Sequence, residues 1–223
     1  APGEDPAAGG PAVSVTVAAD PTMAARPWLC DDDPERLASW RAGARFVRLV
    51  DAAMRTQSTI VHRPVLARSL PVPGDEGSAA RSAAAAAYAA KDLQDWARFC
   101  GVRVSASVPV GVDVDWAQRG AVAVAMVAQP GTRQGRDYVE GIFRARFTDG
   151  RDVADRAVVV DVARRCGIAG PEFEAVLDSA ATLDALRANA DELVRRGGYT
   201  TPTMLLGDDL YVGHARMPLL ESA

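Results

Sequence analysis

The chain has 223 residues, of which 48% are hydrophobic, and its formal net charge at pH 7 is −4. This length can bury a sizeable core, and the weak negative charge gives no reason to expect nucleic acid or an acidic membrane as a partner. No apolar run approaches the roughly 18 residues of a membrane span. Residues 1–12 lack the basic and apolar regions of a signal peptide and are rich in Pro, Gly and Ala. We therefore expect a cytoplasmic protein with a disordered tail over these residues.

The three cysteines, Cys30, Cys100 and Cys166, are widely spaced, and no two of them form a C-x-x-C pair. An odd number without close spacing argues against a disulfide framework and against a zinc site. The run 31–33 (Asp-Asp-Asp) precedes a proline, which is typical of a helix start where carboxylates accept backbone N–H groups. We therefore predict no metal site.

The first elements after the tail predict a β-α-β unit. Residues 13–19 alternate and are rich in β-branched side chains, which favours a strand. A helix is predicted over 31–54, with apolar residues on one face. Residues 59–66 predict a second strand that bends at Pro64.

The middle of the chain predicts helices alone. Their expected ranges are 79–100, 116–127, 138–147, 153–166 and 171–177. A longer helix is predicted over 182–196, because Gly197 and Gly198 are typical of the residues that follow a helix C-terminus.

The last run, 197–216, predicts two strands followed by the start of a helix. Pro202 enters an apolar strand, which is unusual because proline gives no N–H to the ladder, and a cis bond after Thr201 is one common solution. The sequence leaves that isomer open. Strand, turn, strand and helix after such a proline form the C-terminal half of a thioredoxin-like fold. There the residue before the proline faces the active site.

We therefore predict an α/β protein with a thioredoxin-like fold and an all-helical insertion between its βαβ and ββα halves. Residues 13–70 together with 178–223 form the predicted thioredoxin-like domain, and residues 71–177 form the predicted insertion. Function is expected where Thr201 and Pro202 meet the first helix of that domain.

Five short elements, in order along the chain, carry a resemblance to a known family. They are residues 62–66 (His-Arg-Pro-Val-Leu), Tyr88 with Asp92 and Trp96, residues 142–145 with 150–153, residues 186–193, and residues 198–203. With these elements the chain resembles the 2-hydroxychromene-2-carboxylate isomerases. That family is similar to kappa-class glutathione transferases and, more distantly, to DsbA-type disulfide oxidoreductases.

The resemblance implies a serine, or a cysteine in the redox relatives, within a pattern Asp-x-x-Ser/Cys-Pro-aromatic after the first strand. One register places Met23 at that position, and the other places Arg26 there, before Pro27 and Trp28. A thioether has no proton to donate, and arginine is not a nucleophile at neutral pH. We therefore do not expect C-x-x-C disulfide exchange, which needs a thiolate of low pKa. A displaced thiol at Cys30 is the alternative to an unreactive buried cysteine.

A second departure from the family pattern lies at residues 213–216 (Gly-His-Ala-Arg). The resemblance implies Gly-Ser/Gln-Asp-Arg there, with the polar pair and the acid holding the γ-glutamyl end of glutathione. His214 and Ala215 replace that pair, and Arg216 remains. We therefore expect glutathione binding to be lost and predict no cofactor, with glutathione or another low-molecular-weight thiol as the alternative.

The candidate catalytic residues are His214, Arg26 and Thr22. His214 is suited to proton transfer near neutral pH, Arg26 to binding an anion, and Thr22 to supplying a hydroxyl. The alternatives are a surface histidine, a solvated arginine and an ordinary turn residue. The candidate substrate-binding residues are Met23, Trp28, Thr201, Pro202, Arg216 and Phe143.

The sequence thus predicts an isomerase-like enzyme that isomerises or cyclises a small aromatic or polyketide-type molecule in specialised biosynthesis. Its expected partner is that small molecule, without nucleic acid or membrane, and the resemblance implies a homodimer. One alternative is a non-catalytic ligand-binding relative that kept the fold after losing its nucleophile. Another is a transferase or isomerase that uses a low-molecular-weight thiol, with Thr22 as its hydroxyl.

Overall fold

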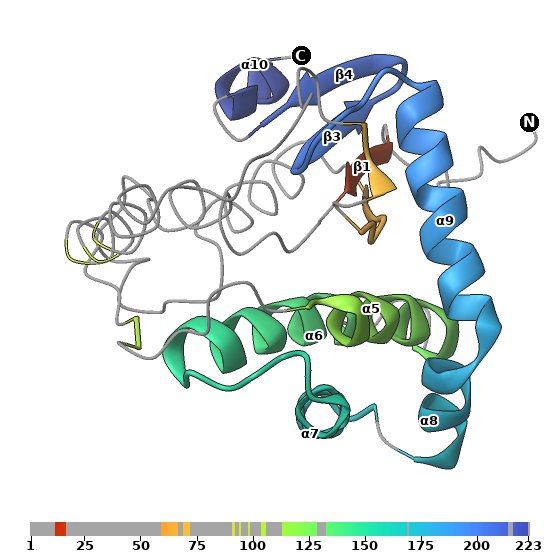
Figure 1. Cartoon of the computed structure of the whole chain (residues 1–223). Helices are drawn as coiled ribbons and strands as arrows, with labels where there is room; N and C mark the ends of the chain where they lie inside the picture. The colour runs from red at the N-terminus through yellow and green to blue at the C-terminus, as the bar shows by residue number, and fades with distance from the viewer. Residues whose placement is uncertain are drawn as a thin grey trace, which may run out of the picture.

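The structure, a computed structural model, describes the chain in segments, and every structural statement below concerns these residues. They are 12–16, 59–66, 69–71, 91, 94, 98, 104–105, 113–128, 133–168, 170–213 and 216–222. Figure 1 shows a small sheet in the upper part of the molecule and a group of helices below it. The predicted tail and the helix expected over 31–54 lie outside the described residues. The helix expected over 79–100 is described at three residues, all helical.

A four-stranded sheet in the order β2-β1-β3-β4 forms the upper layer. Its strands are β1 (Ala12–Thr16), β2 (Thr59–His62), β3 (Thr203–Leu206) and β4 (Asp209–Val212). β1 pairs in parallel with β2 and antiparallel with β3, and β3 pairs antiparallel with β4. The C-terminal hairpin therefore lies beside the first strand, as predicted for a thioredoxin-like sheet.

The ends of the strands follow local backbone chemistry. β2 ends at His62 instead of continuing to residue 66 as predicted, because Pro64 has no N–H for the ladder. The turn between β3 and β4 contains Gly207 at φ 57°, a left-handed conformation that glycine adopts without steric penalty.

Helices α5 to α8 lie between β2 and α9 along the chain and form the lower part of the molecule (Figure 1). They are α5 (Asp115–Val127), α6 (Gln134–Phe143), the π-helical segment η2 (Arg144–Thr148), α7 (Arg156–Arg165) and α8 (Pro171–Asp178). The predicted helix over 138–147 is therefore α6 continued by a π-helical turn. α7 begins at residue 156 and not at 153, because the Asp155 side chain caps it by accepting from the Ala157 N–H at 2.8 Å.

Tyr138 organises the core between α5 and α6. Its side chain is fully buried, and its hydroxyl donates to the Ala117 carbonyl at 3.0 Å. A Cβ on Gly120 would stand 1.9 Å from that hydroxyl, so only glycine lets the phenol reach α5. Burial raises the pKa of Tyr138 well above its usual value, so the phenol stays neutral and keeps its hydrogen bond.

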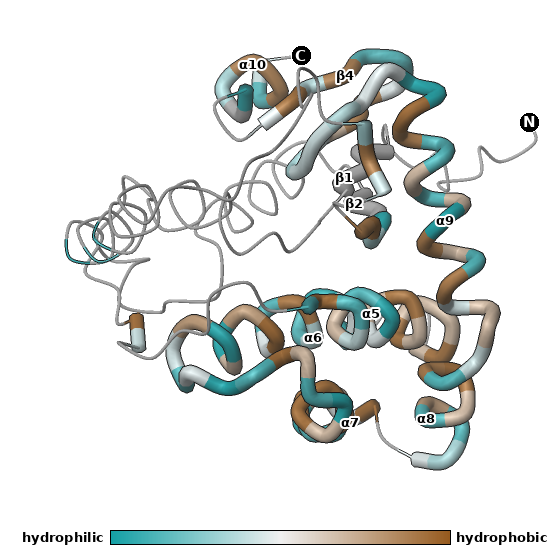
Figure 2. The backbone as a smooth tube through the Cα atoms, in the orientation of Figure 1, coloured by the Kyte–Doolittle hydropathy of each residue, from teal (hydrophilic) through white to brown (hydrophobic). Residues whose placement is uncertain are grey.

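Helix α9 (Ala180–Arg195) runs from the end of α8 to the sheet, where α10 (Met217–Ser222) lies beside β4 (Figure 1). Apolar and polar segments alternate along α9, as expected for a helix with one buried face (Figure 2). Gly197, at φ 88°, and Gly198 donate to the carbonyls of Val194 and Leu193. This closes the helix as the glycine pair predicted. Each helix in the described part is too short or too polar to cross a bilayer.

Candidate functional site

The loop before β3 is the part of the predicted site that the structure describes most fully. The peptide bond between Thr201 and Pro202 is cis. Both residues are partly exposed, whereas Thr203, which opens β3, is completely buried. The loop therefore presents Thr201 and Pro202 to solvent from the end of a buried strand.

Two hydrogen bonds fix this cis-proline loop to its surroundings. The Thr203 hydroxyl donates to the Thr200 carbonyl at 2.7 Å and so bridges the loop. The Gly213 N–H, at the end of β4, donates to the Pro202 carbonyl at 2.9 Å. The loop is thus tied to both strands of the hairpin, and these bonds make it a fixed platform on which Thr201 and Pro202 lie.

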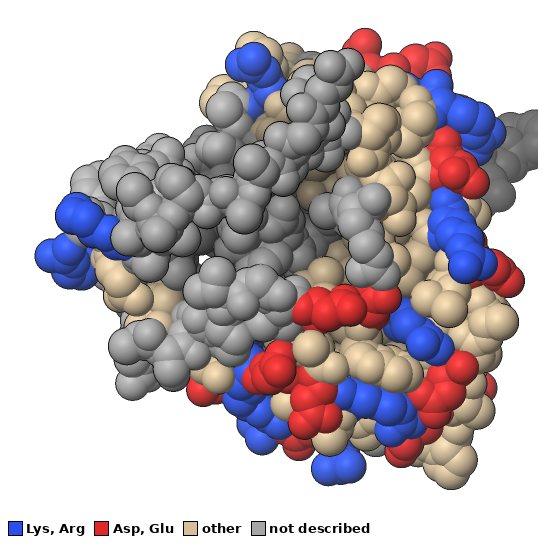
Figure 3. Space-filling model, in the orientation of Figure 1, with Lys and Arg blue, Asp and Glu red and all other residues tan. Residues whose placement is uncertain are grey.

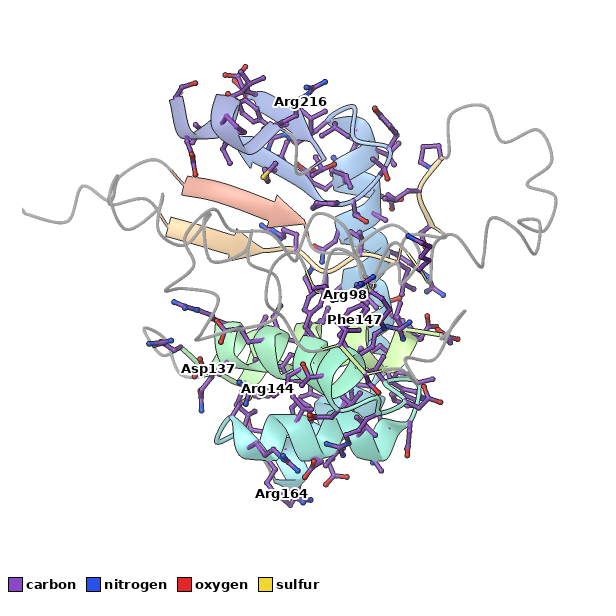
Figure 4. The ribbon with its side chains drawn as sticks, turned by 90° about the vertical axis from the view of Figure 1, so that its left-hand side faces the viewer. Arg98, Asp137, Arg144, Phe147, Arg164 and Arg216 are labelled. Atoms are coloured by element: carbon purple, nitrogen blue, oxygen red, sulfur yellow. The ribbon has the colours of Figure 1, made fainter. Side chains whose placement is uncertain are left out.

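Arg216 is linked to this platform through Gly213. Its backbone N–H donates to the carbonyl of Gly213, the residue that holds Pro202, at 3.2 Å, and its side chain is exposed. Figure 4 shows Arg216 in the sheet layer. An exposed guanidinium three residues after Gly213 is suited to binding a carboxylate.

Phe143 belongs to the helical layer. Only 6% of it is exposed, and its ring stacks on Phe147 with centroids 6.0 Å apart. Figure 4 shows Phe147 between the helices and the sheet. Phe143 packs as a core residue of α6, and its contact with a substrate stays a prediction.

The remaining predicted site residues lie outside the described part of the chain. They are Thr22, Met23, Arg26, Trp28 and His214. Among the described residues, no group of three or more His, Cys, Asp or Glu side chains is placed to hold a metal ion.

Cys166 is the cysteine that the structure describes, and it lies in the helical layer. Burial raises the pKa of its thiol to about 11, with smaller contributions from the Asp137 and Glu140 carboxylates. The thiol is therefore protonated at neutral pH and is a poor nucleophile. It sits in a groove of about 580 Å³ between α6 and α7, which the sequence did not single out.

A model of the DsbA-like thioredoxin domain matches residues 39–223. No significant match to the chain exists among curated protein sequences.

Several solved structures share the fold. A 2-hydroxychromene-2-carboxylate isomerase is 22% identical, with a TM-score of 0.68, covering 94% of this chain and 92% of its own. A probable DsbA oxidoreductase from Streptomyces coelicolor is 19% identical, with a TM-score of 0.69, covering 95% and 87%. The cytosolic disulfide reductase DsbM from Pseudomonas aeruginosa, solved with GSH, is 15% identical, with a TM-score of 0.58, covering 95% and 98%. At these identities the likeness establishes the fold and not the reaction. Because the family model spans most of the sequence, the chain belongs to the DsbA-like thioredoxin family.

Proposed function

We propose that the protein is an isomerase-like enzyme that rearranges or cyclises a small aromatic or polyketide-type molecule without a thiol cofactor. The observation that carries the proposal is a partly exposed cis-proline loop in a chain of this family that has no C-x-x-C pair. Such a chain offers the platform of the family without the dithiol that disulfide exchange needs.

The cysteines support this distinction. Cys30, Cys100 and Cys166 are too far apart in sequence to form the motif. Cys166, whose pKa is raised to about 11, lies in the helical layer and not in the sheet that carries the loop. Disulfide exchange at the described cysteine is therefore disfavoured by both position and protonation state.

The loop supplies backbone groups and a nearby cation. The platform of Thr201 and Pro202 would hold a polar part of the substrate through its backbone, and Arg216 would bind a carboxylate. His214 would move a proton, Arg26 would hold an anion, and Thr22 would supply a hydroxyl. The substrate named for one structural neighbour, 2-hydroxychromene-2-carboxylate, is an aromatic carboxylate of this kind.

The sequence that follows β4 does not match the glutathione-binding pattern expected from the resemblance. Between Gly213 and Arg216 the chain has His214 and Ala215, so no acid is present there to pair with the ammonium of a γ-glutamyl group. We therefore propose that catalysis does not use glutathione. We also propose that the protein acts in the cytoplasm and in specialised biosynthesis.

The test is turnover of 2-hydroxychromene-2-carboxylate, followed by absorbance with and without glutathione. We expect turnover without the thiol, and we expect Arg216→Gln and His214→Gln each to lower kcat/KM more than about 10-fold. The matched control is Arg187→Gln, because Arg187 is an exposed arginine of α9 that pairs with Asp184 at 3.1 Å on the surface of the same helix. It should leave kcat/KM unchanged.

The other outcomes separate the alternatives. Turnover that requires glutathione would overturn the thiol-independent mechanism and favour a thiol-using transferase or isomerase. Stoichiometric binding without turnover, for this compound and for a panel of aromatic and polyketide carboxylates, would favour a non-catalytic relative.

A further inference from the structure

A groove between α6 and α7, called here the α6–α7 groove, is independent of the cis-proline loop. Its volume of about 580 Å³ lies within the range of small-molecule pockets. Its floor consists of small or apolar side chains: Gly141, Ala145, Val162 and Cys166. A Cβ on Gly141 would stand 2.7 Å from Val162 Cγ1, so glycine is required for this close approach of the two helices.

The rim of the groove is charged, and most of its side chains already have partners. Glu140 accepts from Arg136 at 2.9 Å. Arg151 and Arg165 share the single carboxylate of Asp161, at 2.7 and 3.0 Å. The hydrogen bond from Arg151, followed by that from Arg165, lowers the pKa of Asp161, so this carboxylate stays ionised.

Positive charge is nevertheless in excess around the groove. The charged rim residues and their direct ion-pair partners comprise five arginines and four carboxylates, a formal net charge of +1 in a chain of −4. Figure 3 shows how basic and acidic side chains alternate over the helices of the lower part. The residues are Arg133, Arg136, Arg144, Arg151, Arg165, Asp137, Glu140, Asp149 and Asp161. Such a local excess attracts small anions.

Arg144 is the arginine on the rim whose side chain is available to bind a small anion. Its side chain is exposed, and among the described residues its guanidinium has no ion-pair partner within 4.0 Å. Figure 4 shows Arg144 and Asp137 on the same side of the helical layer, whereas Arg164 lies at its lower edge. Arg144 thus combines an uncommitted set of N–H donors with an adjacent apolar floor.

We propose that the α6–α7 groove is a second ligand site, which takes a small organic carboxylate with an apolar body. The apolar body packs on Ala145, Val162 and Cys166, and the carboxylate accepts a bidentate pair of hydrogen bonds from Arg144. The site uses no residue of the cis-proline loop and no step of the proposed reaction, so it stands or falls independently of that function.

Benzoate is the test probe, and benzamide, which has the same shape without the charge, is its control. Backbone amide shifts of the full chain are followed by NMR during titration up to about 10 mM of each compound, with an expected Kd for benzoate on the order of 1 mM. Benzoate should shift the amides of residues 141, 145, 162 and 166, and benzamide should not. Shifts confined to residues 201–203, or no saturable shift, would overturn the proposal.

Three variants test whether Arg144 binds the carboxylate. One should weaken benzoate binding, one should tighten it, and one should leave it unchanged. Arg144→Gln should weaken benzoate binding about 5-fold, because a charge-assisted pair is lost at an exposed site. Asp149→Asn, at the same rim, should tighten it about 2-fold by removing a repelling carboxylate. Arg164→Gln, which removes an arginine of α7 that does not line the groove, should leave it unchanged. An unchanged Kd in Arg144→Gln, or weaker binding in Asp149→Asn, would contradict the assignment.

Discussion

Burial decides the chemistry of Cys166, which is bordered by carboxylates as well as by the core. The thiol lies half-buried on the floor of the α6–α7 groove, with Asp137 and Glu140 on the rim above it. Desolvation disfavours the thiolate first, and the two carboxylates add to that effect by repulsion. At a helix N-terminus or beside a cation, the pKa of a cysteine thiol is lowered instead.

Alkylation of Cys166 should therefore be slow at neutral pH. With a pKa of about 11 instead of 9.0, its thiolate fraction at pH 8 is roughly 100-fold below that of an ordinary cysteine. The rate with iodoacetamide, measured on the Cys166 peptide by mass spectrometry, should rise with pH until about 11.

The control variants separate the causes of this shift. Asp137→Asn should lower the pKa of Cys166, because it removes one repelling carboxylate. Arg164→Gln, on the outer side of α7, should not lower it. A rate that levels off near pH 9 in the unaltered chain would contradict the burial argument.

At the scale of elements, Arg119 joins three helices. From α5 it donates to the carbonyls of Leu177 and Ser179 at 2.6 and 3.3 Å, and its Nε donates to the Thr182 hydroxyl at 3.1 Å. The same guanidinium stacks over Trp116 at 4.4 Å. The cation thus satisfies carbonyls that the end of α8 leaves without helical partners, and it sets the start of α9.

Two buried threonines, one at the cis-proline loop and one between two helices, allow a matched test of what each hydroxyl contributes to stability. Thr203 bridges the cis-proline loop and Thr182 the junction of α8 and α9, and both are fully buried. Thr203→Val and Thr182→Val should each lower the free energy of unfolding by about 1–2 kcal/mol. The first leaves the Thr200 carbonyl short of a donor, and the second leaves the Nε–H of Arg119 without its acceptor. The change in free energy is measured by urea unfolding.

Only Thr203→Val should also change the amide shifts of residues 201 and 213, because its hydroxyl holds the loop that Gly213 contacts. Thr203→Ser, which keeps the hydroxyl, should restore them. Equal shift changes at 201 and 213 in both valine variants would show that the Thr203 hydroxyl has no specific role in positioning the loop.

The elements whose signals are local in sequence were predictable. The pattern of strands and helices predicted the sheet and α5, α8 and α9 to within a few residues, and the glycine pair predicted the end of α9. The predicted boundaries were wrong where a single residue ended, delayed or altered an element. Pro64 ended β2 early, Asp155 delayed α7, and residues 144–148 widened into a π-helical turn.

The site was predictable only in part, for a related reason. Thr201 and Pro202 were recognisable because proline imposes its chemistry on its immediate neighbours. The α6–α7 groove was not, because it depends on the packing of Gly141 against Val162, which are far apart in sequence. Contacts of this kind leave no periodic pattern in the sequence. Met23 and Arg26, the two residues predicted for the nucleophile position, lie outside the described residues.

At the scale of the whole molecule, α9 connects the two parts. Its Leu186 packs with Val122 of α5 and with Leu66, which follows β2. Further along, Ala190 and Leu193 pack with Val65 and Leu70 in a separate cluster. A helix that contributes to both cores couples the stability of the sheet to that of the helical layer.

Asn189 is the polar link in this connection, and its loss should weaken both parts together. Its Nδ2 donates to the carbonyl of Pro64 at 2.8 Å, across 125 positions of sequence. Asn189→Leu, which keeps the size but not the donor, should lower the free energy of unfolding by about 1–2 kcal/mol. Arg187→Ala, at an exposed position of the same helix, should change it by less than about 0.5 kcal/mol. In urea, circular dichroism and tryptophan fluorescence should give coincident transitions for both variants, because α9 makes the two parts unfold as one. Separate transitions in the unaltered chain, or an unchanged midpoint in Asn189→Leu, would mean that the layers are held together elsewhere.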